Sequence, residues 1–128
     1  MGGMHVETTI YTSEKHPEVT VVEVHGDVDC GACGLDRLCG LLHNLVDSGD
    51  LWMVVDLRGA DAVHERALAE ILAVLGRLRL QGGDMMVVAP PGDLLKSVRT
   101  MGFHELTLVL DDVESAIQQA AREAHIGD

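Results

Sequence analysis

The alternation of strand-like and helix-like segments constrains the fold of this chain more than any other feature. Val19–Val24 is rich in β-branched residues and ends at Gly26, as a half-buried strand does. Leu51–Leu57 is nearly all apolar and Asp84–Ala89 is largely so, which favours strands covered on both faces. Helical patterns lie between and after these runs. Strands that alternate with helices predict an α/β domain with a largely parallel sheet.

Two core-facing helices are predicted from leucines spaced three and four residues apart, one from Ala32 to Ser48 and one within Asp61–Leu78. Weak alternation over Val6–Thr12 predicts a first strand, which we expect to be the antiparallel member. We therefore expect a single mixed sheet of about five strands with about four helices, in one domain over residues 1–128 with its core at about 6–120.

The last third of the chain predicts two further helices and one further strand. Asp93–Thr100 favours a short helix capped by Asp93 and ended by Gly102. Leu106–Leu110 favours the last strand. A final helix is expected to be capped by the aspartate pair before it, with apolar residues on one face at Val113, Ala116, Ile117 and Ala120.

Composition narrows the classes of partner. Nine Lys and Arg stand against 21 Asp and Glu, for a formal net charge of −12, which repels a phosphate backbone. Aromatic residues make up only 2% of the chain, so we expect no platform for stacking bases and no nucleic-acid partner. The apolar runs are too short to span a membrane, and the N-terminus lacks a basic region followed by an apolar one. We therefore expect a cytoplasmic protein with no membrane partner.

Charged residues gather where the strand Leu51–Leu57 gives way to the second helix. His64, Glu65 and Arg66 stand at the start of that helix, and Ala67 and Leu68 follow. Another turn, Gly-Asp-Val-Asp at Gly26–Asp29, follows the second strand. Charge at a strand-to-helix junction is exposed on a loop edge, where small α/β domains bind their partners.

The order and spacing of these motifs resemble the STAS domain of bacterial anti-sigma factor antagonists, over roughly Val6 to Ala120. Gly26–Asp29, Asp56-Leu57, Gly82-Gly83 and Met101–Phe103 fall where that family has corresponding short motifs. The resemblance implies a STAS fold, no enzymatic activity and no cofactor. It also implies that the chain binds an anti-sigma factor, which in this family is a histidine-kinase-like ATPase.

The junction departs from the family at the residue that carries the switch. There the family reads Asp-Ser-Ser-Gly-Leu and its first serine is phosphorylated, whereas this chain reads His-Glu-Arg-Ala-Leu over 64–68. No Ser, Thr or Tyr occurs between Ala60 and Gly83, so hydroxyl phosphorylation cannot switch this junction. Glu65 supplies one permanent negative charge, less than the about −1.5 to −2 of a phosphoserine.

Each junction residue has a functional and a plain structural interpretation. Glu65 is a partner contact or a helix-start acid, and His64, a weaker cap than Asp, is an exposed loop residue or a pH-sensitive contact. Arg66 is a surface residue or a partner of Glu70. The resemblance places Asp29 beside this junction, where it contacts the partner, caps the following helix, or does both. Ala67 completes the predicted partner-binding set of Asp29 and residues 64–67.

Three cysteines admit three hypotheses. Cys30 and Cys33 form a Cys-x-x-Cys pair, and Cys39 and His43 lie four residues apart on the first helix. Four such ligands could bind zinc, but a helix leading away from the pair separates them, so we expect no metal. A redox pair at a helix start and inert thiols are the other two hypotheses, and inert thiols are the interpretation we favour.

Two functions follow from the resemblance, and a third is disfavoured. The first is a regulatory domain that binds an anti-sigma factor kinase or related regulator without the serine switch. The second is a STAS scaffold or ligand-sensing domain that assembles with other STAS proteins. An enzyme is disfavoured because no Ser-His-Asp, Cys-His or phosphate-binding glycine pattern occurs at the required spacing.

Overall fold

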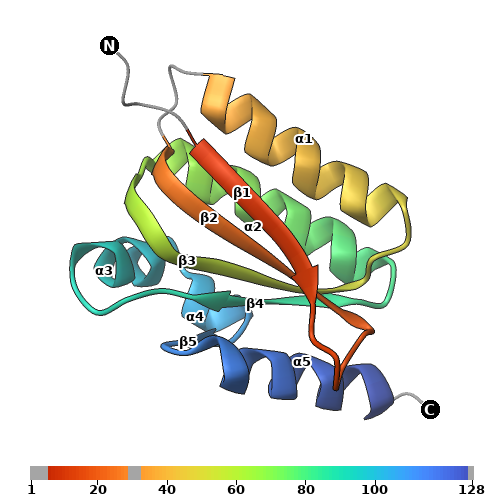
Figure 1. The fold of residues 1–128 in the computed structure, drawn as a ribbon. Helices are drawn as coiled ribbons and strands as arrows, with labels where there is room; N and C mark the ends of the chain where they lie inside the picture. The colour runs from red at the N-terminus through yellow and green to blue at the C-terminus, as the bar shows by residue number, and fades with distance from the viewer. Residues whose placement is uncertain (1–5, 29–32, 127–128) are drawn as a thin grey trace.

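The computed structural model describes residues 6–28 and 33–126, which fold into one mixed sheet with helices on both faces (Figure 1). The strands lie in the order β1-β2-β3-β4-β5, with β1 antiparallel to β2 and the other neighbours parallel. The predicted parallel sheet with an antiparallel first strand is thereby confirmed. The strand bounds are β1 Val6–Thr12, β2 Val19–Val28, β3 Trp52–Val63, β4 Asp84–Val88 and β5 Val109–Leu110.

Five helices occur in the described chain, one more than the sequence predicts. The additional helix is α4, a single turn that begins after Gly102, a residue in the left-handed region at φ 88°. It takes up Leu106, which we had assigned to the last strand, and it buries Phe103 in the core. The helix bounds are α1 Cys33–Asp47, α2 Glu65–Leu80, α3 Asp93–Thr100, α4 Phe103–Leu106 and α5 Val113–Ile126.

Alternate residues of each strand enter two cores. Val22, Val55 and Val87 face the core formed with α1 and α2, whereas Val21, Val54 and Val88 face the core formed with α5. This separation follows from the period of two along a strand. The predicted stripe of the second helix is confirmed, since Leu68, Ile71, Leu75 and Leu78 are buried and Leu72 packs against the same core.

β3 is longer than predicted. The sequence predicts that this strand ends at Leu57, but β3 continues to Val63 because β2 also extends, to Val28, and pairs with it. Two register shifts let β3 accommodate additional residues opposite β2. Bulges of this kind bend a strand and re-aim its side chains. The polar residues of this extension lie in a strand because one face is open there: Arg58 and Asp61 are exposed.

Helix caps differ in part from the prediction. Asp112 caps α5 as expected, since its Oδ1 accepts from the Ser115 backbone N–H at 2.7 Å. Asp93 does not cap α3, because Gly92 occupies the cap position with φ 120° and Asp93 is the first helical residue. Gly102 follows the C-cap Met101 of α3 instead of forming it.

The end of α2 is closed by a pair of glycines. Gly82 has φ 89°, its N–H donates to Arg79 O at 3.1 Å, and the Gly83 N–H donates to Leu78 O at 2.8 Å. This is the Schellman arrangement of a helix C-terminus. Gly83 then lies directly against the Leu51 carbonyl, which accepts from the Asp84 N–H at 3.0 Å. The chain passes from helix to β4 with no space for a side chain at position 83.

None of the helices within residues 6–28 and 33–126 has the length and apolar character that a bilayer crossing requires.

Candidate functional site

The start of α2 lies where the parallel strands β2 and β3 end, at the carboxyl end of the sheet (Figure 1). His64 joins the two, and its backbone N–H donates to the Val28 carbonyl of β2 at 2.9 Å. This hydrogen bond ties the end of β2 to the junction. Carboxyl ends of parallel strands are the usual location of binding sites in open α/β sheets.

His64 caps the helix, a role that the sequence ranking of caps disfavours. Its backbone is extended, at φ −66° and ψ 149°, and its Nδ1 accepts from the Arg66 backbone N–H at 3.1 Å. The imidazole therefore takes the place that a carboxylate or hydroxyl oxygen usually has at a helix start. An accepting Nδ1 requires that this nitrogen carry no proton, so the neutral ring holds its proton on Nε2.

The three charged or titratable residues of the junction face solvent, and the two that follow face the core. His64, Glu65 and Arg66 are exposed, whereas Ala67 and Leu68 are fully buried. Glu65 stands in the first turn, where a carboxylate interacts favourably with the helix dipole. Ala67 packs into the α2 core and therefore contributes to this surface only by setting the position of its neighbours. Asp29 lies outside the described residues.

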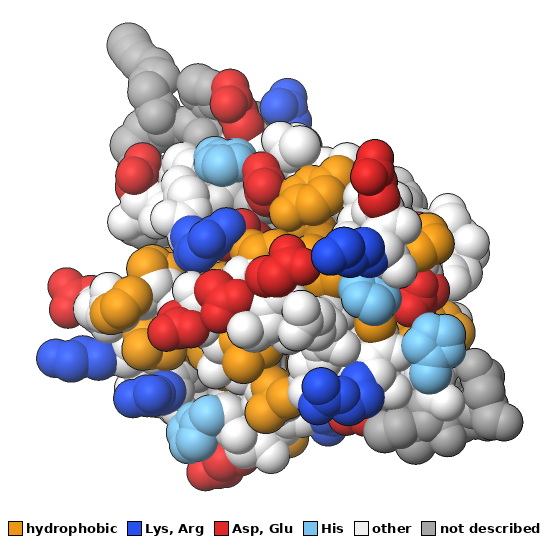
Figure 2. Space-filling model, turned by 60° about the horizontal axis from the view of Figure 1, so that its bottom comes forward, with side chains coloured by type: hydrophobic (Ala, Val, Ile, Leu, Met, Phe, Trp, Pro, Cys, Tyr) orange, Lys and Arg blue, Asp and Glu red, His pale blue; other side chains and the backbone are white. Residues whose placement is uncertain are grey.

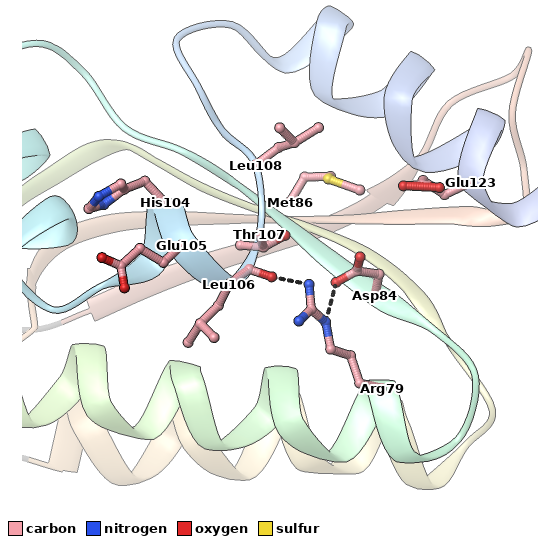
Figure 3. A pocket seen from close by; sticks show the side chains of 9 residues that line it. All are labelled: Arg79, Asp84, Met86, His104, Glu105, Leu106, Thr107, Leu108 and Glu123. Carbon is pink, nitrogen blue, oxygen red and sulfur yellow. Dashed lines mark hydrogen bonds and ion pairs between the residues drawn. The ribbon is translucent and has the colours of Figure 1, made fainter.

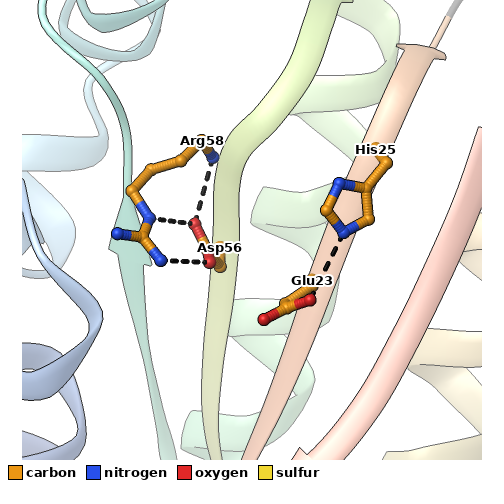
Figure 4. A network of polar contacts seen from close by, with 4 residues as sticks. All are labelled: Glu23, His25, Asp56 and Arg58. Carbon is orange, nitrogen blue, oxygen red and sulfur yellow. Dashed lines mark hydrogen bonds and ion pairs between the residues drawn. The ribbon is translucent and has the colours of Figure 1, made fainter.

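A polar network lies on strands β2 and β3, on the α5 side of the sheet (Figure 4). Asp56 is only 4% exposed and follows Val54 by two residues, so it shares that face. Arg58 folds back over it, donating from Nε to Oδ1 at 3.0 Å and from Nη2 to Oδ2 at 3.1 Å. On β2, His25 Nε2 lies 3.3 Å from Glu23 Oε1. In both pairs the partners lie two residues apart on one strand, a spacing that is visible in the sequence.

Electrostatic interactions in this network perturb two groups. The hydrogen bonds from Arg58 to Asp56 raise the pKa of the guanidinium further above its ordinary value. Burial, and then the neighbouring carboxylates of Glu23 and Asp56, raise the pKa of Tyr11. The His25 ring lies across Gly59, where an added Cβ would come within 2.2 Å of Nδ1. A glycine at 59 therefore lets β3 pass directly beneath the imidazole.

Cavities also occur on the part of the chain that the structure describes, and one of them lies at the same end of the sheet as the junction. It has a volume of about 330 Å³ and lies at the carboxyl ends of β4 and β5, with apolar walls and with Arg99 and Asp111 among its lining residues. A second cavity, of about 240 Å³, lies at the opposite end of the strands, between the end of α2, the start of β4 and α5 (Figure 3). Figure 2 shows acidic, basic and histidine side chains interspersed on the α5 side rather than one basic patch.

The structure describes one of the three cysteine side chains, that of Cys39. Cys30 lies outside the described residues, and so does the side chain of Cys33. Cys39 is half-buried against the α1–α2 core. His43 Nδ1 accepts from Arg77 Nη1 at 2.9 Å, so this proposed ligand links α1 to α2. Among the described side chains there is no group of three His, Cys, Asp or Glu arranged to hold a metal ion.

Comparison with known proteins identifies the fold. No protein-family model and no curated protein sequence matches the chain. The crystal structure of an anti-sigma factor antagonist from Mycobacterium paratuberculosis matches with a TM-score of 0.80 at 17% identity, covering 90% of this chain and 93% of that one. The Bacillus anti-sigma factor antagonist SpoIIAA, unphosphorylated, matches with a TM-score of 0.68 at 12% identity, covering 91% of this chain and 98% of that one.

A third similar structure is a variant of RsbS from Moorella thermoacetica in which a serine is replaced by glutamate. It matches with a TM-score of 0.72 at 13% identity and covers 93% of this chain and 98% of that one. Identities this low establish the architecture alone. The chain has the STAS fold found in anti-sigma factor antagonists.

Proposed function

We propose that this chain is a non-enzymatic regulatory domain that binds an anti-sigma factor kinase, or a related regulator, through the N-terminus of α2. The observation that carries the proposal is the exposed set His64, Glu65 and Arg66 at a strand-to-helix junction, in a fold shared with anti-sigma factor antagonists. Asp29 is proposed to belong to the same surface, and the buried Ala67 to hold these residues in position. The protein is proposed to act in the cytoplasm, where sigma factors work.

The chemistry at position 65 decides how such a partner is bound. An unmodified serine in the first turn of the helix presents a neutral hydroxyl, and its phosphate adds charge and acceptor oxygens near unpaired backbone N–H groups. Glu65 places a carboxylate at this position whether or not a kinase has acted. Against a partner that accepts serine and rejects phosphate, Glu65 is a repulsive element.

A titration tests this proposal. Calorimetry would compare the wild type with the double variant His64→Asp, Glu65→Ser against the anti-sigma factor kinase of the same organism. We expect the variant to bind at least tenfold more tightly, which corresponds to about 1.4 kcal/mol. Glu114→Ser is a matched control, because Glu114 is also an exposed acid in the first turn of a helix, α5. Equal affinities for wild type and double variant, with all proteins folded, would refute the role of Glu65.

Phosphorylation provides a second, independent test. Incubation with the same kinase and ATP should leave residues 60–83 unmodified, because no hydroxyl side chain occurs there. The double variant, which restores a serine at position 65, should gain one phosphate in that segment if the kinase recognises the junction. Peptide mass spectrometry measures both. Phosphate on residues 63–68 of the wild type, on His64 for example, would contradict the absence of a switch.

A further inference from the structure

The two edges of the sheet are protected to different degrees. At the β5 edge the strand is only Val109–Leu110, and the exposed rim of β4 is capped by side chains. Asp84 Oδ1 accepts from the Met85 N–H at 2.8 Å, and the Thr107 hydroxyl donates to the Met85 carbonyl. Arg79, seen in Figure 3, bridges Asp84 and the Leu106 carbonyl. Short strands and capped backbone groups are how proteins prevent further strands from adding to an edge.

The β1 edge has none of these devices in the described chain. β1 pairs with β2 over seven consecutive residues without a register shift, and within residues 6–28 and 33–126 no other strand pairs with it. It contains neither Pro nor Lys, and five of its seven residues are β-branched. Ile10 is 43% exposed although it lies on the face of the α1–α2 core. A long, regular edge with an exposed aliphatic side chain is suited to pairing with another strand.

We propose that β1 pairs in antiparallel orientation with β1 of a second copy of this chain, joining the two sheets across a two-fold axis. In the register centred on Thr9, Thr9 lies opposite Thr9, Thr8 opposite Ile10, and Glu7 opposite Tyr11 of the other copy. Thr–Thr pairs and pairs of β-branched residues are favourable across antiparallel strands, and this register places no like charges opposite one another. Because residues 7, 9 and 11 share one face, the same face of both sheets is continuous.

Charge favours a second copy over a charged partner at this edge. The chain carries a formal net charge of −12, yet Glu7 is the only acidic or basic residue of β1. Such a strip offers little to attract a basic partner, and it is where two acidic copies approach with the least local repulsion. The remaining repulsion between the two molecules is long-range and is screened by salt. Self-pairing should therefore strengthen as salt is added, whereas binding of a basic partner would weaken.

Sedimentation velocity over a series of protein concentrations, at about 0.05 M and about 0.5 M NaCl, tests the proposal on the full chain. We expect a reversible monomer–dimer equilibrium that shifts toward dimer at the higher salt. Ile10→Lys, which places a charge on the edge, should raise the dimer Kd at least tenfold. Leu80→Lys is the matched control, because Leu80 is 89% exposed and lies at the end of α2, away from β1. The dimer Kd of this variant should equal that of the wild type.

Hydrogen exchange locates the interface and keeps the test decisive. Amides of β1 should gain protection as the wild type is concentrated, and those around Leu106 and Leu108 should not. If Ile10→Lys does not fold, as judged by circular dichroism, Thr8→Lys makes the same change at another exposed β1 position. A monomer at every concentration, a dimer that both lysine variants leave intact, or protection confined to another surface would overturn the proposal. None of these measurements involves the kinase, so their outcome is independent of the function proposed for the N-terminus of α2.

Discussion

Gly83→Ala is the substitution for which the structure makes the sharpest prediction. A Cβ at position 83 would lie 2.0 Å from the Leu51 carbonyl oxygen and 2.8 Å from the Leu51 carbonyl carbon. Real Cβ atoms essentially never approach closer than 3.0 Å, so the two segments would have to separate by at least the difference, 1.0 Å. Both obstructing atoms are backbone, which cannot rotate away as a side chain can. The separation would break the Asp84 N–H···O Leu51 hydrogen bond, where β4 begins beside β3.

The expected destabilisation of Gly83→Ala is the sum of two costs. Losing a backbone hydrogen bond and leaving its groups unsatisfied costs about 1–3 kcal/mol, and forcing extra volume into a packed region costs about 1–3 kcal/mol. We therefore expect Gly83→Ala to lower the free energy of unfolding by about 3 kcal/mol or more. With an unfolding entropy of about 2.1 cal/mol/K per residue, that is a fall in Tm of about 10 °C for a chain of this length.

Two other glycines of the same region provide controls for the same substitution. Gly76 lies inside α2 with no atom within 4 Å of its Cβ position, so Gly76→Ala should stabilise by about 0.5–1 kcal/mol. Gly82 has open space but φ 89°, so Gly82→Ala should cost about 1–2 kcal/mol. Chemical denaturation of the three variants measures all three values. A Gly83→Ala protein within about 0.5 kcal/mol of wild type would refute the steric argument.

Further predictions concern a cap, a titrating carboxylate and the core. His64→Ala removes the acceptor for the Arg66 N–H and should destabilise by about 0.5–2 kcal/mol in denaturant titrations. Hydrogen bonds from the Ser115 backbone N–H and hydroxyl lower the pKa of Asp112 in the folded protein. The Asp112 carboxylate therefore stabilises the fold at pH values above its unfolded pKa. This contribution is lost as the pH falls through its folded pKa. Asp112→Asn should accordingly reduce the fall in Tm between pH 6 and pH 3, and an unchanged fall would contradict this linkage. Leu42→Ala, at a fully buried site, should cost about 2–5 kcal/mol, whereas Leu80→Ala, at an exposed one, should leave the unfolding midpoint nearly unchanged.

Much of the fold was predictable because burial leaves a periodic trace in sequence. Leucines three and four residues apart located α1 and α2, and the apolar runs located β3 and β4. This periodic pattern fails where one face of a strand is exposed to solvent. The end of β3 carries Arg58 and Asp61 because solvent reaches them, so a strand there has the composition of a turn. It fails again at α4, because one helical turn is too short to show a period.

The exposed charge at the start of α2 was predictable from the sequence, but its local hydrogen bonds were not. The sequence predicted exposed charge at the start of α2, and the structure places His64 to Arg66 there. The capping role of His64 was missed because general cap preferences rank imidazole low, while the local backbone aims Nδ1 at the Arg66 N–H. The Asp56–Arg58 pair is hard to predict because a charge at the end of an apolar run has the same sequence signature as the end of a strand. Such features depend on side-chain direction, which composition does not report.

The hydrogen bond from the Arg66 N–H to His64 has a chemical consequence of its own. A carboxylate or hydroxyl cap keeps an acceptor oxygen available over most of the pH range, but an imidazole nitrogen accepts only while it holds no proton. The cap therefore depends on the tautomer of the ring, since only the form with its proton on Nε2 leaves the Nδ1 lone pair able to accept from the Arg66 N–H. The first turn of α2 is held through a single nitrogen lone pair, whereas a carboxylate at this position would offer two acceptor oxygens.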